Sequence, residues 1–175
     1  YLNAENAYFE AQMKPRAVLV ETLFQEMKGR MKEDDASVPQ KDGEWLYWRR
    51  FEKGAQYKQW LRKPVSGGAE QLIFNEAKEA EGKEYFRLGG IGISDDDTIL
   101  AYATDTDGSE RFTIRFRDLK TGKDLPDTIP GTLGGFVWAK ETNTILYGLV
   151  NENWRIDTIK AHRLGTPVAE DTIVY

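Results

Sequence analysis

The sequence contains no cysteine in its 175 residues. Disulfides and zinc sites built on thiolates are therefore excluded, and such a chain suits a reducing compartment, so we expect a cytoplasmic protein. Long apolar runs are also missing, since none approaches the ~18 residues that a membrane-spanning helix needs. No signal peptide is evident. These absences predict a chain with no membrane partner.

Basic residues are too few for a typical nucleic-acid binder. Lys and Arg together number 24 against 29 Asp and Glu, which gives a net charge of −5. Proteins that bind nucleic acid usually carry a basic excess that neutralises phosphates. Short basic runs such as WRR and RFR do alternate with aromatic residues, but the acidic turns beside them cancel their field. We therefore expect no nucleic-acid partner.

The residues that are present describe a globular chain. Apolar residues make up 40% of the sequence and charged residues 30%, a balance typical of folded domains. The length suffices for one ordinary domain with a core, or for a part of something larger. Because the chain starts at Tyr1 without a methionine and ends on an apparent strand, AEDTIVY, we expect a fragment of a longer protein.

Residues 1–33 have a helical pattern. The run YLNAENAYFEAQ is rich in helix formers, and Pro15 marks a break after it. Beyond the break, apolar residues recur at helical spacings of three, four and seven, at Ala17, Val20, Phe24, Met27 and Met31. Such a stripe could form a groove for a partner, but packing into a core is the interpretation that we favour. The following stretch, KEDDASVPQKDG, is rich in turn formers and predicts an exposed loop.

From Glu44 onward the sequence predicts short β-strands. The runs EWLYWRRF, QYKQWLRK and EQLIF are rich in aromatic and β-branched residues. The connector between the first two, EKGAQ, contains a glycine and is typical of a hairpin loop. The charged spacer NEAKEAEGKE follows, with a helical turn expected in it, and further strands then extend to the end of the chain.

These strands repeat along the chain. The matches are Thr98–Leu100 with Thr144–Leu146 and Ile91 with Val137 at an offset of 46, and Thr113-Ile114 with Thr158-Ile159 and Leu119 with Leu164 at an offset of 45. A period near 45 with four short strands per unit is typical of the blades of a β-propeller, whereas a β-sandwich needs no fixed period. We therefore predict a mainly β fold: a helical segment with its loop over residues 1–42, then about three four-stranded blades over residues 43–175.

The segment TDTDGSE, residues 104–110, looks like part of a calcium loop, because two aspartates spaced by one residue precede a glycine. An EF-hand loop, however, requires a further ligand where Ala103 stands and a glutamate where Ile114 stands. Asp107-Gly108 is instead a strong signal for a two-residue hairpin turn, since glycine tolerates positive φ. We therefore predict a hairpin turn here.

Candidate catalytic groups are sparse. The one histidine, His162, aligns by the repeat with Arg117, which predicts a solvated strand face for it. No serine lies in the G-x-S-x-G motif of a nucleophile elbow; the serines are Ser37, Ser66, Ser94 and Ser109. The run SDDD, residues 94–97, could ligate a metal, but a solvated turn is favoured. We assign no catalytic, cofactor-binding or metal-binding residue.

The glycine-rich run LGGIGIS has a simpler explanation than dinucleotide binding. Its spacing is not G-x-G-x-x-G, and no helix is predicted after it. Glycines suit the innermost strand of a blade, where backbones crowd near the axis of the propeller. We therefore predict that LGGIGIS forms an inner strand.

Longer phrases of the sequence resemble a known family. They are YLNAENAY, QEMKGRMKEDDASVP, DGEWLYWRR, EYFRLGGIGISDDDTILAYATDTDGSERFTIRFRDLKTGKDLPDTI and NENWRID. Together they resemble the oligopeptidase B branch of the prolyl oligopeptidase family of serine peptidases, over nearly the whole chain. The resemblance implies an N-terminal helical segment that packs on a C-terminal α/β-hydrolase domain of the same chain, followed by the first blades of a seven-bladed propeller.

The resemblance also implies an activity for the longer protein. Such enzymes cleave short peptides after Lys or Arg with a triad of serine, histidine and aspartate, and the propeller limits entry to short peptides. No position in residues 1–175 matches the motifs of that triad, so this chain alone is expected to be inactive. Its implied partners are peptides with basic residues and the hydrolase domain. The alternative is a non-enzymatic propeller that acts as a scaffold for another protein.

An incomplete ring of blades has a physical consequence of its own. Repeat units bury their faces on their neighbours, so a unit without its neighbour leaves an apolar face exposed. We expect at least one such face in residues 1–175, and self-association that covers it.

Overall fold

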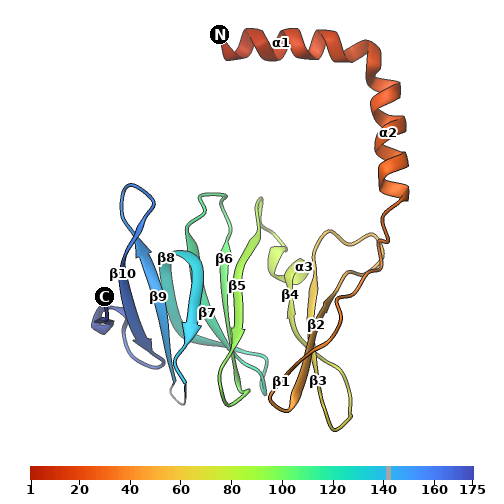
Figure 1. Ribbon diagram of the computed structural model, residues 1–175. Coiled ribbons are helices and arrows are strands. Elements are labelled where there is room, and N and C mark those ends of the chain that lie inside the picture. Colours follow the sequence, from red (N-terminus) through yellow and green to blue (C-terminus); the bar gives the residue numbers. More distant parts are fainter. Residues whose placement is uncertain (141–142) are drawn as a thin grey trace.

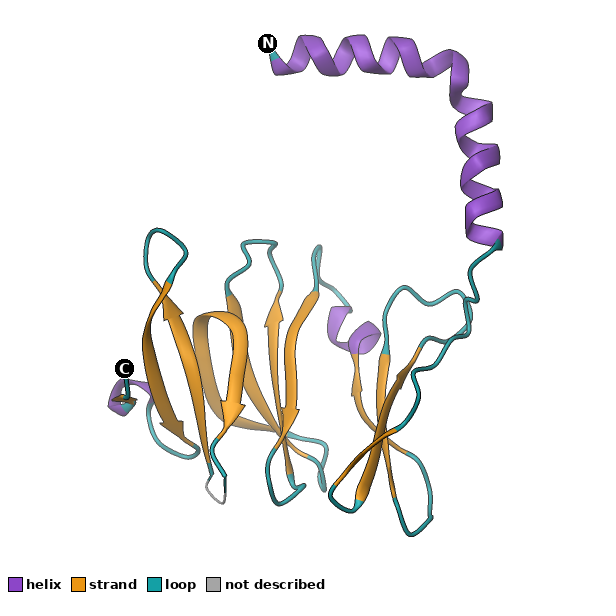
Figure 2. Ribbon diagram, viewed as in Figure 1, coloured by secondary structure: helices purple, strands orange, loops and turns teal. Residues whose placement is uncertain are grey.

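The computed structural model describes residues 1–140 and 143–175 (Figure 1). The chain begins with helix α1 (Leu2–Met13), the 3-10 turn η1 (Lys14–Arg16) and helix α2 (Ala17–Gly29). Pro15 lies in η1, where the chain turns sharply between the two helices (Figure 2). Proline lacks a backbone N–H and obstructs a continuous helix, so the predicted break is confirmed. In the described ranges, no helix is long and apolar enough to cross a membrane.

The apolar stripe of α2 does not pack into a core. Val20, Phe24 and Met27 are 48%, 52% and 59% exposed. No residue of α1 or α2 is buried, and Figure 1 shows α2 extending away from the strands and α1 lying apart from them. The prediction of core packing is therefore wrong for residues 1–175, because no described element faces the stripe.

The first blade is an antiparallel sheet. Among the described residues its strands lie in the order β1 (Gln40–Asp42), β2 (Trp45–Arg50), β3 (Gln59–Pro64) and β4 (Gln71–Asn75). The three strands predicted from EWLYWRRF, QYKQWLRK and EQLIF are confirmed as β2, β3 and β4. Strand β1 was expected to be part of an exposed loop, but Lys41 pairs with Leu46 of β2. The charged spacer contains helix α3 (Glu76–Ala80), and Asn75 caps it by accepting a hydrogen bond from the Lys78 N–H at 3.2 Å.

A second sheet contains two further blades in the described ranges. Its neighbouring strands are β5 (Arg87–Ile93), β6 (Ile99–Asp105), β7 (Phe112–Asp118), β8 (Asp124–Trp138), β9 (Thr144–Val150), β10 (Ile156–Arg163) and β11 (Thr172–Ile173), with the 3-10 turn η2 (Val168–Glu170) before β11. The long strand β8 serves both blades, since its first half pairs with β7 and its second half with β9. Gly131 and Gly134 lie between the halves at φ +76° and +85°, a conformation that glycine adopts readily.

The middle strands of blades 2 and 3 correspond at an offset of 45. Leu100 pairs with Arg117 in blade 2, and Ile145 pairs with His162 in blade 3. Leu100 and Ile145 are both fully buried, whereas Leu146 is half-buried. Matching Leu100 with Leu146 at an offset of 46 is therefore wrong by one residue, and a shift of one residue moves a side chain to the other face of a strand.

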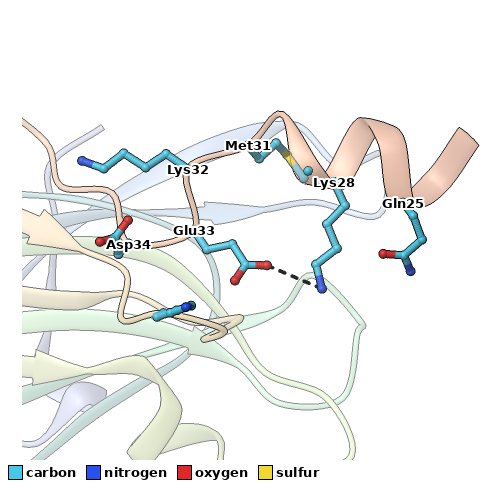
Figure 3. A pocket seen from close by; sticks show the side chains of 8 residues that line it. Gln25, Lys28, Met31, Lys32, Glu33 and Asp34 are labelled. Carbon is cyan, nitrogen blue, oxygen red and sulfur yellow. Dashed lines mark ion pairs between the residues drawn. The ribbon is translucent and has the colours of Figure 1, made fainter.

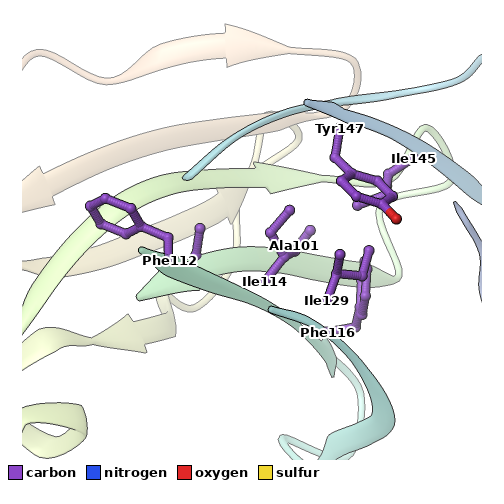
Figure 4. Close-up of a cluster of buried hydrophobic side chains, with 8 residues drawn as sticks. Ala101, Phe112, Ile114, Phe116, Ile129, Ile145 and Tyr147 are labelled. Carbon is purple, nitrogen blue, oxygen red and sulfur yellow. The ribbon is translucent and has the colours of Figure 1, made fainter. Parts of the chain in front are cut away.

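Two apolar clusters in the described residues hold the blades together. The cluster between blades 2 and 3 is shown in Figure 4 and comprises Ala101, Ala103, Phe112, Ile114, Phe116, Ile129, Ile145 and Tyr147. The cluster between blades 1 and 2 comprises Ile73, Phe74, Phe86, Leu100 and Tyr102. Burying one large apolar side chain stabilises a fold by about 1.5–3 kcal/mol, so both interfaces stabilise the arrangement of the blades.

Apolar side chains remain exposed on the first and third blades. Leu72 of β4 is 53% exposed, Val137 of β8 is 66% exposed and Ile173 of β11 is 65% exposed. The expected exposure of apolar blade surface is confirmed. Self-association through this surface stays a prediction.

Candidate functional site

The loop between β6 and β7, residues 106–111, is organised by a buried aspartate. The carboxylate of Asp105 accepts backbone N–H bonds at 2.9–3.0 Å from Asp107, Gly108 and Glu110. Gly108 has φ +80°, so the predicted positive φ and the hairpin are confirmed. The loop is longer than the predicted two-residue turn, because Asp105 accepts hydrogen bonds from N–H groups as far along the chain as that of Glu110. The two aspartates are therefore spaced to accept hydrogen bonds from backbone N–H groups of the loop.

The turn between β5 and β6 contains the run SDDD and is confirmed as a turn. Asp96 accepts hydrogen bonds from the hydroxyl groups of Ser94 and Thr98, at 2.6 and 2.8 Å. The bond from Ser94 is the main cause that lowers the pKa of the Asp96 carboxyl below its usual value. In the described part of the chain, no group of three or more His, Cys, Asp or Glu side chains could hold a metal ion.

Asp97, at the end of this turn, links blade 2 to blade 1. Its φ of +61° is uncommon for a residue other than glycine. The Tyr47 hydroxyl donates to Asp97 Oδ1 at 3.0 Å, and Arg62 Nη1 donates to the Asp97 carbonyl oxygen at 2.7 Å. Arg62 is 5% exposed, and its guanidinium lies 3.9 Å from the centre of the Trp45 ring. The sequence did not reveal this contact, since nothing in SDDD points to residue 47.

Because its hydroxyl is partly buried, Tyr47 is expected to make the folded chain less stable at high pH. Burial raises the pKa of Tyr47 in the folded protein from its ordinary 10.0 to about 12. Below the ordinary pKa the hydroxyl is neutral in both the folded and the unfolded chain, and its contribution to stability is complete. That contribution is lost as the pH rises through the pKa of the folded protein. We expect the stability difference between the wild type and Tyr47→Phe to be constant below pH 10.0 and to shrink up to about pH 12. Urea unfolding across this range measures it.

The matched control for this experiment is Tyr8→Phe. Tyr8 lies on α1 and is 64% exposed, so its replacement should leave the dependence of stability on pH as it is in the wild type. Stability profiles of the wild type and Tyr47→Phe that stay parallel to the alkaline limit would contradict the prediction.

A partly buried arginine fixes helix α3 against blade 2. Arg117 Nε donates to Asp124 Oδ1 at 2.7 Å, and Arg117 Nη2 lies 2.9 Å from Glu79 Oε1 of α3. The Arg117 side chain is 15% exposed. A buried charge is tolerated only when it is paired and hydrogen-bonded. This cluster therefore holds the connection from blade 1 in place.

His162 takes the place of Arg117 in blade 3. This correspondence is as predicted. The prediction that His162 lies on a solvated strand face is wrong, because its side chain is fully buried and its ring stacks against Phe116 of blade 2. The Nδ1 atom lies 2.7 Å from Asp171 Oδ1, and Nε2 lies 3.3 Å from Asp127 Oδ1. Both ring nitrogens face carboxylates, so neither is placed to activate a nucleophile.

Two tyrosines complete these clusters. Tyr102 donates to Asp124 Oδ2 at 2.8 Å, and Tyr147 donates to Asp171 Oδ2 at 2.7 Å. Burial raises the pKa of both hydroxyl groups. The sequence did contain a signal for them, since the two tyrosines stand at the same offset of 45 as Arg117 and His162. The polar clusters therefore belong to the repeat itself, and each joins the second and third strands of its own blade to the start of the fourth.

Hollows on the described part of the chain were not predicted, and two of them concern the candidate site. One, of about 450 Å³, lies at the foot of α2 (Figure 3), where Lys28 pairs with Glu33 at 3.5 Å. Both of these side chains are exposed, so we assign no ligand there. The other, of about 370 Å³, lies between blades 1 and 2, with β1 on one side and residues 91–93 of β5 on the other.

The sequence has relatives among known peptidases. A family model for the prolyl oligopeptidase N-terminal beta-propeller domain matches residues 1–175. Dipeptidyl aminopeptidase BI of Pseudoxanthomonas mexicana is 37% identical over 100% of this chain and 27% of its own length. Protease 2 of Moraxella lacunata is 30% identical over 100% of this chain and 26% of its own length. The chain thus spans about a quarter of the length of these curated relatives.

Solved structures show the same arrangement. Oligopeptidase B from Leishmania major matches with a TM-score of 0.91 and 28% identity, over 99% of this chain and 25% of that one. Oligopeptidase B from Trypanosoma brucei, in a closed form with covalently bound antipain, matches with a TM-score of 0.88 and 29% identity over the same shares. Because 99% of the chain is covered, the similarity extends over the helices as well as the blades.

Proposed function

Because this chain belongs to the family of prolyl oligopeptidase N-terminal β-propeller domains, we propose that it is the N-terminal part of a serine oligopeptidase that cleaves short peptides after Lys or Arg. The observation that carries the proposal is the match to oligopeptidase B with a TM-score of 0.91 over 99% of the chain. The acyl-transfer step, in which histidine activates a serine and an oxyanion hole stabilises the intermediate, belongs to the rest of the protein.

The blades contribute selection of substrates by size. A bulky folded protein cannot pass a narrow entrance, whereas an extended peptide can, so this selection needs no specific contact with the blades. The turn at residues 95–97 carries three aspartates, and its field attracts basic peptides weakly.

The exposed stripe of α2 is proposed to dock on the hydrolase domain. Val20, Phe24 and Met27 are about half exposed on a helix that no described element faces. An apolar face of this kind marks a surface for contact with another unit of protein. The curated relatives are about four times as long as this chain, which supports a further domain as the occupant.

Phe24→Asp is expected to weaken this docking in the full-length protein. Losing the burial of one phenylalanine costs about 3 kcal/mol, so the full-length protein should melt at a lower temperature, whereas the 1–175 chain should be unchanged. Gln25→Asp is the matched control, because it adds the same charge on α2 beside the stripe. Calorimetry of both variants in both chains measures the effect, and an equal loss of stability in the 1–175 chain would contradict docking.

The proposed activity is tested with fluorogenic dipeptides given to the full-length protein and to the 1–175 chain. We expect the full-length protein to cleave after Lys or Arg, to ignore the matching substrate that ends in alanine, and to be silenced by a serine-directed fluorophosphonate. The 1–175 chain should release no fluorophore. Each basic substrate is offered with a blocked and with a free amino terminus, since one relative is named a dipeptidyl aminopeptidase.

The outcomes separate the candidate functions. If the full-length protein cleaves only substrates with a free amino terminus, its function is that of an aminopeptidase of the same family rather than that of an oligopeptidase. A full-length protein that leaves every substrate untouched while it binds another protein through its blades would favour the scaffold alternative.

A further inference from the structure

The hollow between blades 1 and 2 borders two strand edges. Its volume is about 370 Å³. Strand β1 lines one side, and residues 91–93 of β5 line the other. In the described ranges, β1 and β5 each stand at the end of a sheet, so the main-chain groups along one edge of each strand have no strand partner. All three residues of β1 are exposed.

Apart from the three polar residues of β1, the hollow is lined mainly by apolar and aromatic side chains. Blade 1 contributes Trp60 and Ile73, and blade 2 contributes Ile91, Ile93 and Leu100. A second hollow of about 180 Å³ adjoins the first and shares four lining residues with it, Gln40, Tyr47, Trp60 and Ile73. Strand β1 therefore borders both hollows. An apolar hollow beside an unpaired strand edge is the combination that binds an extended peptide, because the edge pairs with the main chain and the hollow accepts a side chain.

The charge at one end of the hollow favours a basic peptide. Asp42 lines the hollow, and Glu44 follows it in the same exposed hairpin. The turn at residues 95–97 lies close to this hairpin, since Asp97 Oδ2 would be 3.9 Å from a Cβ added at Gly43. Lys41 is the one basic residue among the residues that line the hollow. This acidic end attracts Lys or Arg.

We propose that the edge of β1 and the adjoining hollow bind an extended peptide by strand addition, with an aliphatic or aromatic side chain in the hollow and a basic residue towards Asp42. The inference rests on the proposed peptidase function for its occupant, a peptide substrate. Binding here holds longer substrates to the propeller and discriminates among them by an apolar residue, whereas a dipeptide is too short to use it.

The first experiment measures binding by tryptophan fluorescence. The full-length protein, inactivated with a fluorophosphonate, is titrated with a peptide of about ten residues that contains Phe and Arg, and with the same peptide carrying Gly in place of Phe. We expect the Phe peptide to change the emission and to bind about tenfold more tightly than the Gly peptide. Trp60→Phe should lose the response, and Trp154→Phe, which alters an exposed tryptophan on the β9–β10 loop, should keep it.

The second experiment changes the shape of the hollow in the active full-length protein. Ile91→Trp fills it and Ile91→Ala removes its apolar wall, so both variants should raise KM for the ten-residue substrate by about fivefold while kcat/KM for a basic dipeptide stays within about twofold. Ile156→Trp, at an exposed position of β10, is the matched control. Ile91→Ala decides the test if the bulkier variant fails to fold.

The results separate this inference from the proposed function. The peptide site is overturned if the protein cleaves the basic dipeptide but Trp60 gives no response, or if the Ile91 variants leave KM for the longer peptide unchanged. Either result shows that the rest of the protein fills the hollow or that nothing binds there. Absence of dipeptide cleavage overturns the proposed function, while the fluorescence titration still decides whether an apolar, basic peptide binds at β1.

Discussion

Replacing Gly90 by alanine should destabilise the chain by about 3 kcal/mol, although it adds a single methyl group. A Cβ atom at Gly90 would lie 2.2 Å from the carbonyl oxygen of Gly134. That oxygen belongs to the backbone of β8, so it cannot rotate away as a flexible side chain would. The clash can be relieved only if β5 moves away from β8, and this movement loosens the packing between blades 2 and 3. Urea unfolding of the 1–175 chain measures the loss.

Gly135→Ala is the matched control for Gly90→Ala. Gly135 lies next to Gly134 in β8, and a Cβ atom there would meet nothing within 4 Å. Its φ is not positive, so alanine should change the free energy of unfolding by no more than about 0.5 kcal/mol. Similar losses in the two variants would contradict the close approach of β5 and β8.

Asp105→Ala should cost about 3 kcal/mol, because it leaves three backbone N–H groups of the β6–β7 loop without their charged acceptor. Those groups belong to Asp107, Gly108 and Glu110. Asp105→Asn retains one acceptor oxygen, so its loss should be smaller. Thermal unfolding of the 1–175 chain compares the variants.

The control for the Asp105 experiment is Asp107→Ala. The Asp107 carboxylate accepts a hydrogen bond from the Ser109 N–H at 2.9 Å in an exposed loop, so its removal should have a much smaller effect than that of the buried Asp105. Added calcium should leave the melting temperature of the wild type unchanged. A rise in melting temperature with calcium would contradict the hairpin-only interpretation of TDTDGSE and indicate a calcium site there.

The sequence alone determined the two N-terminal helices and the order of the strands from β2 onward, whereas strand β1 was expected to be loop. Pro15 marked the break between the helices, aromatic and β-branched runs marked the strands, and a period near 45 marked the blades. These features are encoded locally, because strand and helix propensities and turn residues act over a few neighbours in the chain. The glycines of LGGIGIS were likewise recognised as residues of a crowded inner strand.

Only the tertiary structure decided which faces are covered and which contacts join the blades. His162 stands on a strand position that alternation predicts to be solvated, yet Phe116 of the neighbouring blade covers it. The stripe of α2 was expected in a core, yet it is exposed. Asp97 meets Tyr47 across 50 residues of chain. A repeating pattern specifies the period of each strand but not the neighbour that will lie against it, because burial depends on elements that are distant in the sequence.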